Sequence, residues 1–359
     1  MSYLETLRES AKETKSIVCM GLDPVPKYLP DEFQKDGVKG IDDFYSSLFS
    51  LMKEQQVFPG AFKLNQGFFI TWDEPSNRKY LGSEELDWVM THLREQFPHI
   101  PVILDYKRGD IKDSSANYAE EGLGCLNWGA DAVTVHPYMG TDSVAPFLEY
   151  CVEHHGKGVY ILNRTSNPGA KDFQNLEVVL DKQAFLTGMR EQLQQLCVQY
   201  IENAGSMSET PHFAEALGVI IGKANERFNE SFDWSSLPPG AIPTPLYQVV
   251  SHKILEWAQD HPGVGAVVGA TSPDELSEIA RIYAGKDIPL LIPGVGKQGG
   301  SASEVVKRLK EANYDLSLVR INSSSALTHS WAPNPAPKDW KDLCIANLRK
   351  LNEEISYQL

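Results

Sequence analysis

The sequence has few cysteines and no long apolar run. Its five cysteines are odd in number and form no CxxC pair: Cys19, Cys125, Cys151, Cys197 and Cys344. Scattered thiols of this kind are typical of a reducing compartment, and they predict neither a disulfide framework nor a zinc site. No run of about eighteen apolar residues occurs, and residues 1–15 lack the apolar centre of a signal peptide. We therefore expect a cytoplasmic protein without a membrane span.

Positive charge is also scarce. The chain has 33 Lys and Arg against 48 Asp and Glu, which gives a formal net charge of −15. Binding to nucleic acid requires a surplus of basic residues, so this balance argues against a nucleic-acid partner. An acidic protein that binds an anionic metabolite must concentrate its positive charge locally. A hydrophobic content of 42% over 359 residues permits one large core.

Short apolar segments alternate with helical patterns along the chain. We expect strands near residues 16–24, 61–65, 101–107, 132–138, 158–165, 264–270, 289–293 and 316–322. We expect helices from residue 41 and at 83–97, 113–126, 142–153 and 181–203, then from residue 272 and at 302–312 and 339–356. Eight such units favour an α/β fold, a closed (β/α)8 TIM barrel. We predict one barrel domain over residues 1–359, with 205–245 as a segment inserted before the sixth strand, because this segment is too long for an ordinary connection.

The end of the third strand carries the most informative stretch, residues 103–111. Alternation places Asp105 and Lys107 on the same face as Ile103, and Gly109 is expected to permit a sharp turn before Asp110. An ordinary strand-end ion pair is one interpretation. The functional interpretation is favoured because other strands also end in polar residues: Asp23, Lys63, His136, Ser166 and Gln298. In a barrel these ends meet on one face, where active sites lie.

The motifs at these ends resemble those of the orotidine 5′-phosphate decarboxylase family, in particular its longer bacterial branch. The segment Leu-Asp-Tyr-Lys-Arg-Gly-Asp-Ile at 104–111 carries the Asp-x-Lys-x-x-Asp pattern of that family. Further matching segments follow in the family's order: Gly21–Pro24, Phe62–Asn65, Val135–Gly140, Arg164–Gly169, Val268–Thr271 and Pro293–Gly300. The resemblance runs from about residue 16 to 325 apart from the insertion, and the combination is far more specific than one motif.

The resemblance implies the decarboxylation of orotidine 5′-phosphate to UMP and CO2, the final step of de novo pyrimidine synthesis, without a metal or other cofactor. It implies a charge network of Lys63, Asp105, Lys107 and Asp110. Lys107 would stabilise the carbanion and donate the proton. Asp110 would reach across a homodimer into the partner's site.

The resemblance also implies binding roles. Asp23 and Lys63 would contact ribose hydroxyls, Ser166 the pyrimidine edge and Gln298 the phosphate. Ser114 would join the ribose site from the partner chain. Three further residues complete the expected binding set: Asn167, Lys297 and Gly299. Asp23 could equally be a turn residue, and His136, which precedes a proline, is interpreted as structural.

One position departs from the family pattern. The family has an arginine after the eighth strand that binds the phosphate, and this chain has Ser325 there. Arg320 is expected near the other end of the barrel, about 16 Å away along an extended strand. Lys297 could replace the lost charge; otherwise backbone N–H groups and serine hydroxyls must bind the phosphate.

Two alternatives stay open. Ser325 suggests a catalytically weakened barrel that only binds nucleotides, which tight UMP binding without CO2 release would reveal. A metal-dependent aldolase or decarboxylase acting on an open-chain sugar phosphate shares the Asp-x-Lys-x-x-Asp pattern. Those enzymes use a magnesium-ligating carboxylate near the second strand, where this chain has Lys63.

Overall fold

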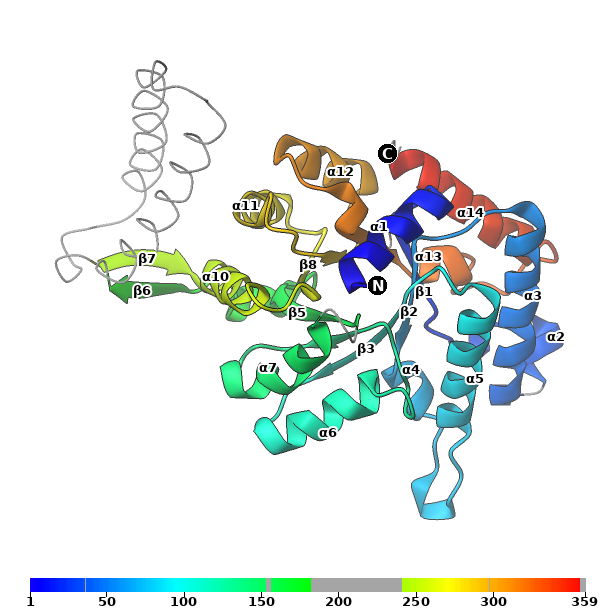
Figure 1. The fold of residues 1–359 in the computed structure, drawn as a ribbon. Coiled ribbons are helices and arrows are strands. Elements are labelled where there is room, and N and C mark those ends of the chain that lie inside the picture. The colour runs from blue at the N-terminus through cyan, green and yellow to red at the C-terminus, as the bar shows by residue number, and fades with distance from the viewer. Residues whose placement is uncertain (36, 153–155, 182–240, 297, 356–359) are drawn as a thin grey trace. The chain divides into compact units, whose positions relative to one another are not determined.

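The computed structural model describes the chain except for residues 36, 153–155, 182–240, 297 and 356–359. Eight parallel strands close into a barrel, each paired with its neighbours (Figure 1). In order around the barrel they are β1 (Val18–Gly21), β2 (Ala61–Asn65), β3 (Val102–Arg108), β4 (Ala132–Val135), β5 (Gly158–Arg164), β8 (Val264–Val268), β9 (Leu290–Ile292) and β10 (Val319–Ser323). The predicted (β/α)8 barrel is confirmed.

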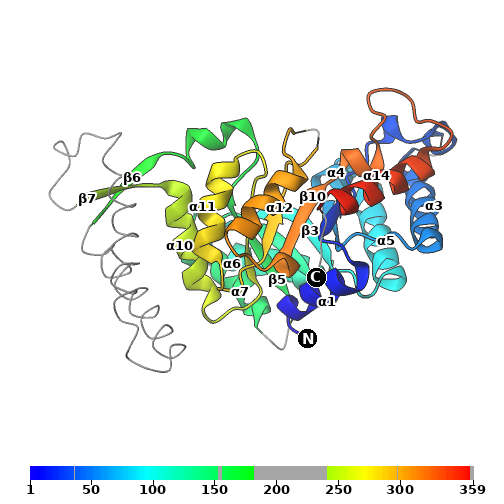
Figure 2. The ribbon, with the colours of Figure 1, turned by 90° about the horizontal axis from the view of Figure 1, so that it is seen from above.

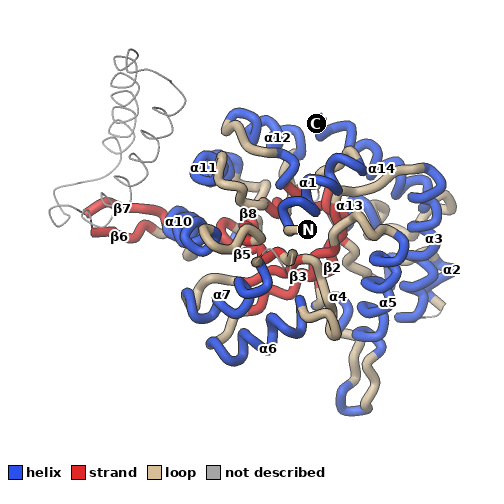
Figure 3. The backbone as a smooth tube through the Cα atoms, in the orientation of Figure 1, coloured by secondary structure: helices blue, strands red, loops and turns tan. Residues whose placement is uncertain are grey.

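Helices surround the ring of strands (Figure 3). The longer ones are α1 (Tyr3–Thr14), α3 (Gly40–Gln55), α5 (Leu81–Gln96), α6 (Lys112–Leu123), α7 (Thr141–Leu148), α10 (Leu246–Ala258), α11 (Pro273–Tyr283), α12 (Ala302–Glu311) and α14 (Trp340–Ile355). Short helices α2 (Asp31–Gln34), α4 (Gly67–Ile70) and α13 (Ser325–Thr328) lie in the connections. None of the described helices is long and apolar enough to cross a membrane.

The structure adds one helix and corrects two predicted boundaries. Helix α10, directly before β8, was not predicted, and the predicted helix at 181–203 lies almost wholly outside the described residues. Helix α7 ends at Leu148, earlier than expected, and a 3₁₀ turn follows it. The last barrel strand begins at Val319 and not at residue 316, because the Asp315 carboxylate accepts hydrogen bonds from Ser317 and stabilises a 3₁₀ turn there.

The barrel interior is filled by residues that alternate with outward-facing ones. Ile103 of β3 packs in the inner cluster, whereas Leu104 and Tyr106 pack with the surrounding helices, as the alternation predicted. Helix α1 lies at the end of the barrel where the strands begin (Figure 2). Its Tyr3 is buried and donates a hydrogen bond to the Tyr160 hydroxyl inside the barrel, at 3.1 Å. That end is therefore closed, and the opposite end is left for a site.

A second unit, Asn175–Leu246, lies in the chain between β5 and β8, which confirms an insertion before the sixth barrel strand. Its described residues form an antiparallel pair, β6 (Glu177–Asp181) and β7 (Ala241–Pro245). Most of the predicted inserted segment, 205–245, falls outside the described residues. That boundary and the assignment of 1–359 to a single domain stay predictions.

Candidate functional site

Asp105 lies between two lysines at the open end of the barrel. Its Oδ2 is 3.0 Å from Nζ of Lys63, and its Oδ1 is 2.5 Å from Nζ of Lys107. Asp105 and Lys63 are buried, at 7% and 4% exposure, while the Lys107 side chain is 47% exposed. The structure thus brings together three of the four predicted network residues, with the ammonium of Lys107 on the solvent side.

The charges in this cluster are mutually stabilised. Burial by itself would raise the pKa of the Asp105 carboxyl, but Lys63 and Lys107 outweigh it and hold that pKa well below its usual range. Burial alone would lower the pKa of Lys63; Asp105 and then Asp23 reverse this and raise it above its ordinary value. At neutral pH, Asp105 is therefore a carboxylate and Lys63 an ammonium.

The backbone at Lys107 is unusual. Lys107 has φ +46°, in the left-handed region that non-glycine residues seldom adopt. Its N–H donates to Oγ1 of Thr134 at 3.0 Å, and that hydroxyl donates to Oδ1 of Asp105 at 2.8 Å. Sequence reasoning missed Thr134. The feature of the sequence that could have revealed Thr134 is its hydroxyl side chain on the same inward face of β4 as Ala132.

Gly109 has a different role from the one we predicted. Its φ lies outside the left-handed region, which Lys107 occupies instead. A Cβ added at Gly109 would lie 2.3 Å from Nε2 of His136. Glycine is therefore required here for space, because the His136 ring packs against the backbone.

Asp23 joins the cluster from the loop after β1. Its Oδ1 is 3.9 Å from Nζ of Lys63 and accepts a hydrogen bond from the backbone N–H of Asn65 at 3.3 Å. Asp23 thus also ties the ends of β1 and β2 together, and its side chain lines the cavity described below.

Two predicted residues lie apart from the cluster in one chain. The Asp110 carboxylate accepts a hydrogen bond from the N–H of Ile111, and no described lysine lies within ion-pair distance of it. Ser114 is half-buried in α6 and makes no hydrogen bond through its side chain to the described residues.

The loops after β5 and β9 are joined by a hydrogen bond between two residues that were each predicted for the site. The Ser166 hydroxyl donates to Oε1 of Gln298 at 2.9 Å. Gly294 makes this approach possible: its φ is +101°, and an added Cβ would lie 2.9 Å from Cβ of Ser166. Asn167 is exposed, and its side-chain oxygen accepts a hydrogen bond from the Thr165 hydroxyl and not from Ser166 or Gln298.

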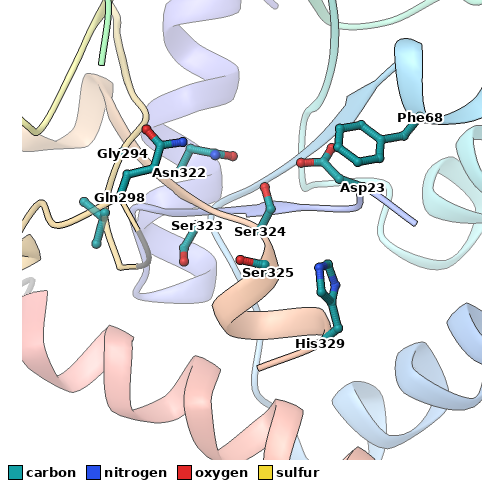
Figure 4. Close-up of a pocket in the computed structure, with 10 residues that line it drawn as sticks. Asp23, Phe68, Gly294, Gln298, Asn322, Ser323, Ser324, Ser325 and His329 are labelled. Atoms are coloured by element: carbon teal, nitrogen blue, oxygen red, sulfur yellow. The ribbon is translucent and has the colours of Figure 1, made fainter. Parts of the chain in front are cut away.

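A cavity of about 200 Å³ lies beside the cluster. Figure 4 shows Asp23 and Phe68 on one side of it and Gln298 on the other. The serines at the end of β10 and just after it lie between them, and the sequence had predicted that serine hydroxyls here could bind a phosphate. The lining residues that sequence reasoning missed include Phe68, Asn322 and His329.

The loop around Gln298 matches the prediction in part. Gly299 has φ +94°, which glycine tolerates and other residues seldom adopt. Lys297, the expected substitute cation, lies outside the described residues. A run of serines after a strand was the available signal for the polar floor of this cavity.

Arg320 lies at the closed end of the barrel. Its fully buried guanidinium donates to the carbonyls of Gly60, Leu7 and Ser317 at 2.6–3.0 Å. The prediction that Arg320 cannot replace an arginine at position 325 is confirmed. Among the described residues, no three His, Cys, Asp or Glu side chains are grouped so that they could hold a metal ion.

The fold and the site define a (β/α)8-barrel enzyme with an ammonium–carboxylate–ammonium cluster beside a polar cavity. A family model described as the orotidine 5′-phosphate decarboxylase / HUMPS family matches residues 81–245. Two curated relatives named orotidine 5′-phosphate decarboxylase, from Delftia acidovorans and Cupriavidus metallidurans, are 30% and 31% identical to the chain. Each alignment covers 92% of this chain and 90% of the relative. The chain belongs to the orotidine 5′-phosphate decarboxylase family, whose members are carboxy-lyases.

Solved structures agree with this fold. The structure of Leishmania donovani UMP synthase has a TM-score of 0.63 and 26% identity, covering 99% of this chain and 56% of that one. The structure of Leishmania donovani OMP decarboxylase has a TM-score of 0.61 at 24% identity, covering 99% of both chains. The second likeness supports the fold alone.

Proposed function

We propose that the protein converts orotidine 5′-phosphate to UMP and CO2 by a Lys/Asp charge network, without a cofactor. The bond between C6 of the pyrimidine and its carboxylate carbon breaks, and the electron pair stays on C6 as a vinyl carbanion. A proton from the Lys107 ammonium then forms the C6–H bond of UMP. Solvent returns a proton to the amine, so the net reaction consumes one proton and releases one CO2.

The observation that carries this proposal is the position of Asp105 between Nζ of Lys63 and Nζ of Lys107. A fixed ammonium beside C6 stabilises the carbanion electrostatically, since it needs little reorganisation as charge develops. The same group is an acid within reach of the carbon that must be protonated. Asp105, already charged, would disfavour a substrate carboxylate next to it and favour its departure as neutral CO2.

Binding roles follow from where the other side chains lie. Asp23 and Lys63 would contact the ribose hydroxyls, and Ser166 with Gln298 would meet the pyrimidine and the phosphate. The serines that follow β10, Ser325 among them, would bind the phosphate together with backbone N–H groups, with Gly299 and Lys297 in the adjoining loop. Asn167 would contribute at the mouth of the site.

We further propose a cytoplasmic homodimer in which Asp110 and Ser114 complete the partner's site. Asp110 has no lysine partner among the described residues of its own chain. The adjoining loops expose apolar side chains, Ile111 at 59%, Tyr138 at 89% and Met139 at 42%. Exposed apolar residues around an incomplete charge cluster support burial against a second copy.

The central experiment follows the loss of orotidine 5′-phosphate by absorbance, with EDTA present and UMP titrated as an inhibitor. Turnover that EDTA does not change, with competitive inhibition by UMP, supports the proposal. Tight UMP binding without CO2 release would instead support a nucleotide-binding barrel, the alternative that Ser325 suggests. EDTA-sensitive turnover of a sugar phosphate would overturn both.

The shared site has its own test. Lys107→Ala and Asp110→Ala should each be inactive alone, yet mixing the two should restore activity, because one site of the mixed dimer carries neither substitution. Subunit exchange is verified by mass spectrometry of differently tagged chains. No recovery after proven exchange would show that Asp110 acts within its own chain.

A further inference from the structure

Arg108 is the neighbour of Lys107 on β3, and its side chain points away from the barrel interior. Its Nη2 donates to Oε1 of Gln66 at 2.9 Å and lies 3.2 Å from Oε1 of Glu121. The guanidinium carbon lies 5.1 Å and 4.8 Å from the ring centres of Tyr106 and Tyr118. One side chain therefore connects β3, the loop before α4 and helix α6.

These partners are themselves connected. Nε2 of Gln66 donates to Oε1 of Glu121 at 3.0 Å, and the Gln66 N–H donates to the Asp105 carbonyl at 3.2 Å. The Tyr106 hydroxyl donates to the Tyr118 carbonyl at 2.8 Å. The acceptors of the Arg108 Nη2 are thus fixed within one hydrogen-bonded network, while the buried Nε of Arg108 has no hydrogen-bond partner among the described residues.

The strand is irregular where this side chain attaches. The register of β3 against β4 shifts between Leu104 and Arg108, and pairing resumes where Arg108 lies opposite Val135. The Arg108 carbonyl accepts a hydrogen bond from the N–H of His136 at 3.0 Å. Within the shift, Lys107 takes its left-handed conformation. A bulge of this kind redirects a side chain, and a left-handed lysine persists only when its surroundings hold it.

We propose that Arg108 is a positioning residue: its anchored guanidinium fixes the bulge of β3 and so directs the ammonium of Lys107 onto Asp105. The contacts of the Arg108 side chain fix the backbone after the bulge, and the buried ion pair of Asp105 fixes the backbone before it. Lys107 lies between these two residues, so its backbone conformation is constrained. The proposal rests on the proposed function for its kinetic consequence, but the geometry it states is independent of any activity.

Lysine is not an adequate substitute for arginine at this position. The planar guanidinium stacks on aromatic rings while it donates to two acceptors, whereas an ammonium on a flexible stem does not combine these contacts. Arg108→Lys therefore tests the anchoring at constant charge, and Arg108→Met tests it at similar length without charge.

The kinetic test compares these variants with Arg281→Met, which changes an exposed arginine in α11. In Arg108→Met, kcat should fall on the order of 10- to 100-fold, because the proton donor is misdirected. UMP affinity should stay within about threefold of wild type, since the proposed binding groups other than Ser114 follow other strands. Arg108→Lys should recover little activity, and added guanidinium should rescue Arg108→Gly in part. Arg281→Met should match wild type.

Equal losses of kcat and UMP affinity would overturn the proposal, because they indicate general damage to the site. Unchanged kcat in Arg108→Met would also overturn it. If that variant does not fold, Gln66→Leu and Glu121→Gln each remove one anchor and should lower kcat in the same selective manner.

A crystallographic measurement separates this inference from the proposed function. In Arg108→Met, φ of Lys107 should move to a negative value and its Nζ should leave Asp105, whether or not the wild type decarboxylates orotidine 5′-phosphate. A positive φ retained at Lys107 in that variant would overturn the positioning role alone. An inactive wild type with the expected change in φ would overturn only the reaction.

Discussion

Two buried carboxyl groups in this protein have opposite ionisation for a simple physical reason. Asp105 has an ammonium within 3.0 Å on either side, and its pKa is held well below its usual range despite burial. Glu85 in α5 is equally buried, at 5% exposure, beside Asp42 of α3. Burial first, and then the hydrogen bond and charge of Asp42, raise the pKa of Glu85 to about 9, and the nearby Lys39 does not compensate.

The hydrogen bonds show the same contrast. Asp105 accepts from Lys63, Lys107 and Thr134. Oε2 of Glu85 and Oδ1 of Asp42 are buried and have no donor among the described residues. A proton on Glu85 supplies the missing donor between the two carboxyl groups. Burial beside a second carboxyl group thus keeps Glu85 neutral, and paired cations keep the buried Asp105 charged for chemistry.

Lys107→Ala should give the largest effect. Removing the outer ammonium leaves neither a charge to stabilise the carbanion nor a proton for it, so we expect kcat to fall on the order of 10³-fold or more. Circular dichroism and UMP binding should show an intact fold. Lys253→Ala, an exposed lysine paired with Glu256 in α10, is the matched control. A Lys107→Ala enzyme within about tenfold of wild type would refute this role.

Lys63→Met should shift the ionisation of Asp105 toward that of Glu85, a buried carboxyl group without paired cations. With one ammonium lost, the pKa of Asp105 should rise, because burial is then opposed only by Lys107 and the weaker hydrogen bond from Thr134. Wild-type Asp105, with a depressed pKa, contributes stability above its unfolded pKa and loses it only as pH falls through the folded value. The variant should lose stability and kcat/KM at a higher pH, with activity reduced on the order of 100-fold.

The measurement is a pH series of thermal melts and initial rates from pH 4 to 8, alongside Lys63→Met/Asp105→Asn. The double variant should regain thermal stability relative to Lys63→Met, since the poorly compensated charge is gone, while activity stays low. If Lys63→Met, like wild type, shows no acid limb between pH 4 and 8, Lys63 does not set the ionisation of Asp105.

Ser325→Arg tests whether an added cation also stabilises the negative charge of a bound ligand, the phosphate of UMP. The cavity beside Gln298 offers hydroxyls and backbone groups around Ser325, and an added guanidinium should tighten UMP binding about tenfold. Isothermal titration with UMP measures this, and uridine, which lacks the phosphate, should bind unchanged. Weaker UMP binding would mean that another group already occupies the phosphate position.

Glu85→Gln should give the smallest effect. Because the native protein retains a proton on Glu85 that the unfolded chain loses, stability falls as pH rises from about 4.5 to about 9. The amide of Glu85→Gln does not ionise, so this variant avoids that loss of stability. Its Tm should exceed that of wild type by a few degrees at pH 9 and differ little at pH 5. Glu95→Gln, at an exposed position near the end of the same helix, is the control. An equal pH dependence in wild type and Glu85→Gln would show that Glu85 ionises normally.

Most of the barrel could be predicted because its signals are local. Apolar strands and amphipathic helices repeat along the chain, and buried parallel strands require that pattern. The boundary of β10 and the presence of α10 could not be predicted so directly. In the first case the Asp315 side chain competes with strand pairing, and in the second the helix follows a segment without the regular spacing.

The sequence by itself determined which charged and polar groups are available: Asp105 and Lys107 on one face of β3, Lys63 on β2, and a serine at position 325. Their order, and the motifs around them, were sufficient for the fold and the family. Only the tertiary structure decided that Lys107 is left-handed, that Thr134 connects it to Asp105, and that Asp110 lacks a lysine partner among the described residues of its own chain. These features depend on contacts between residues far apart in the chain, and no local pattern encodes such contacts.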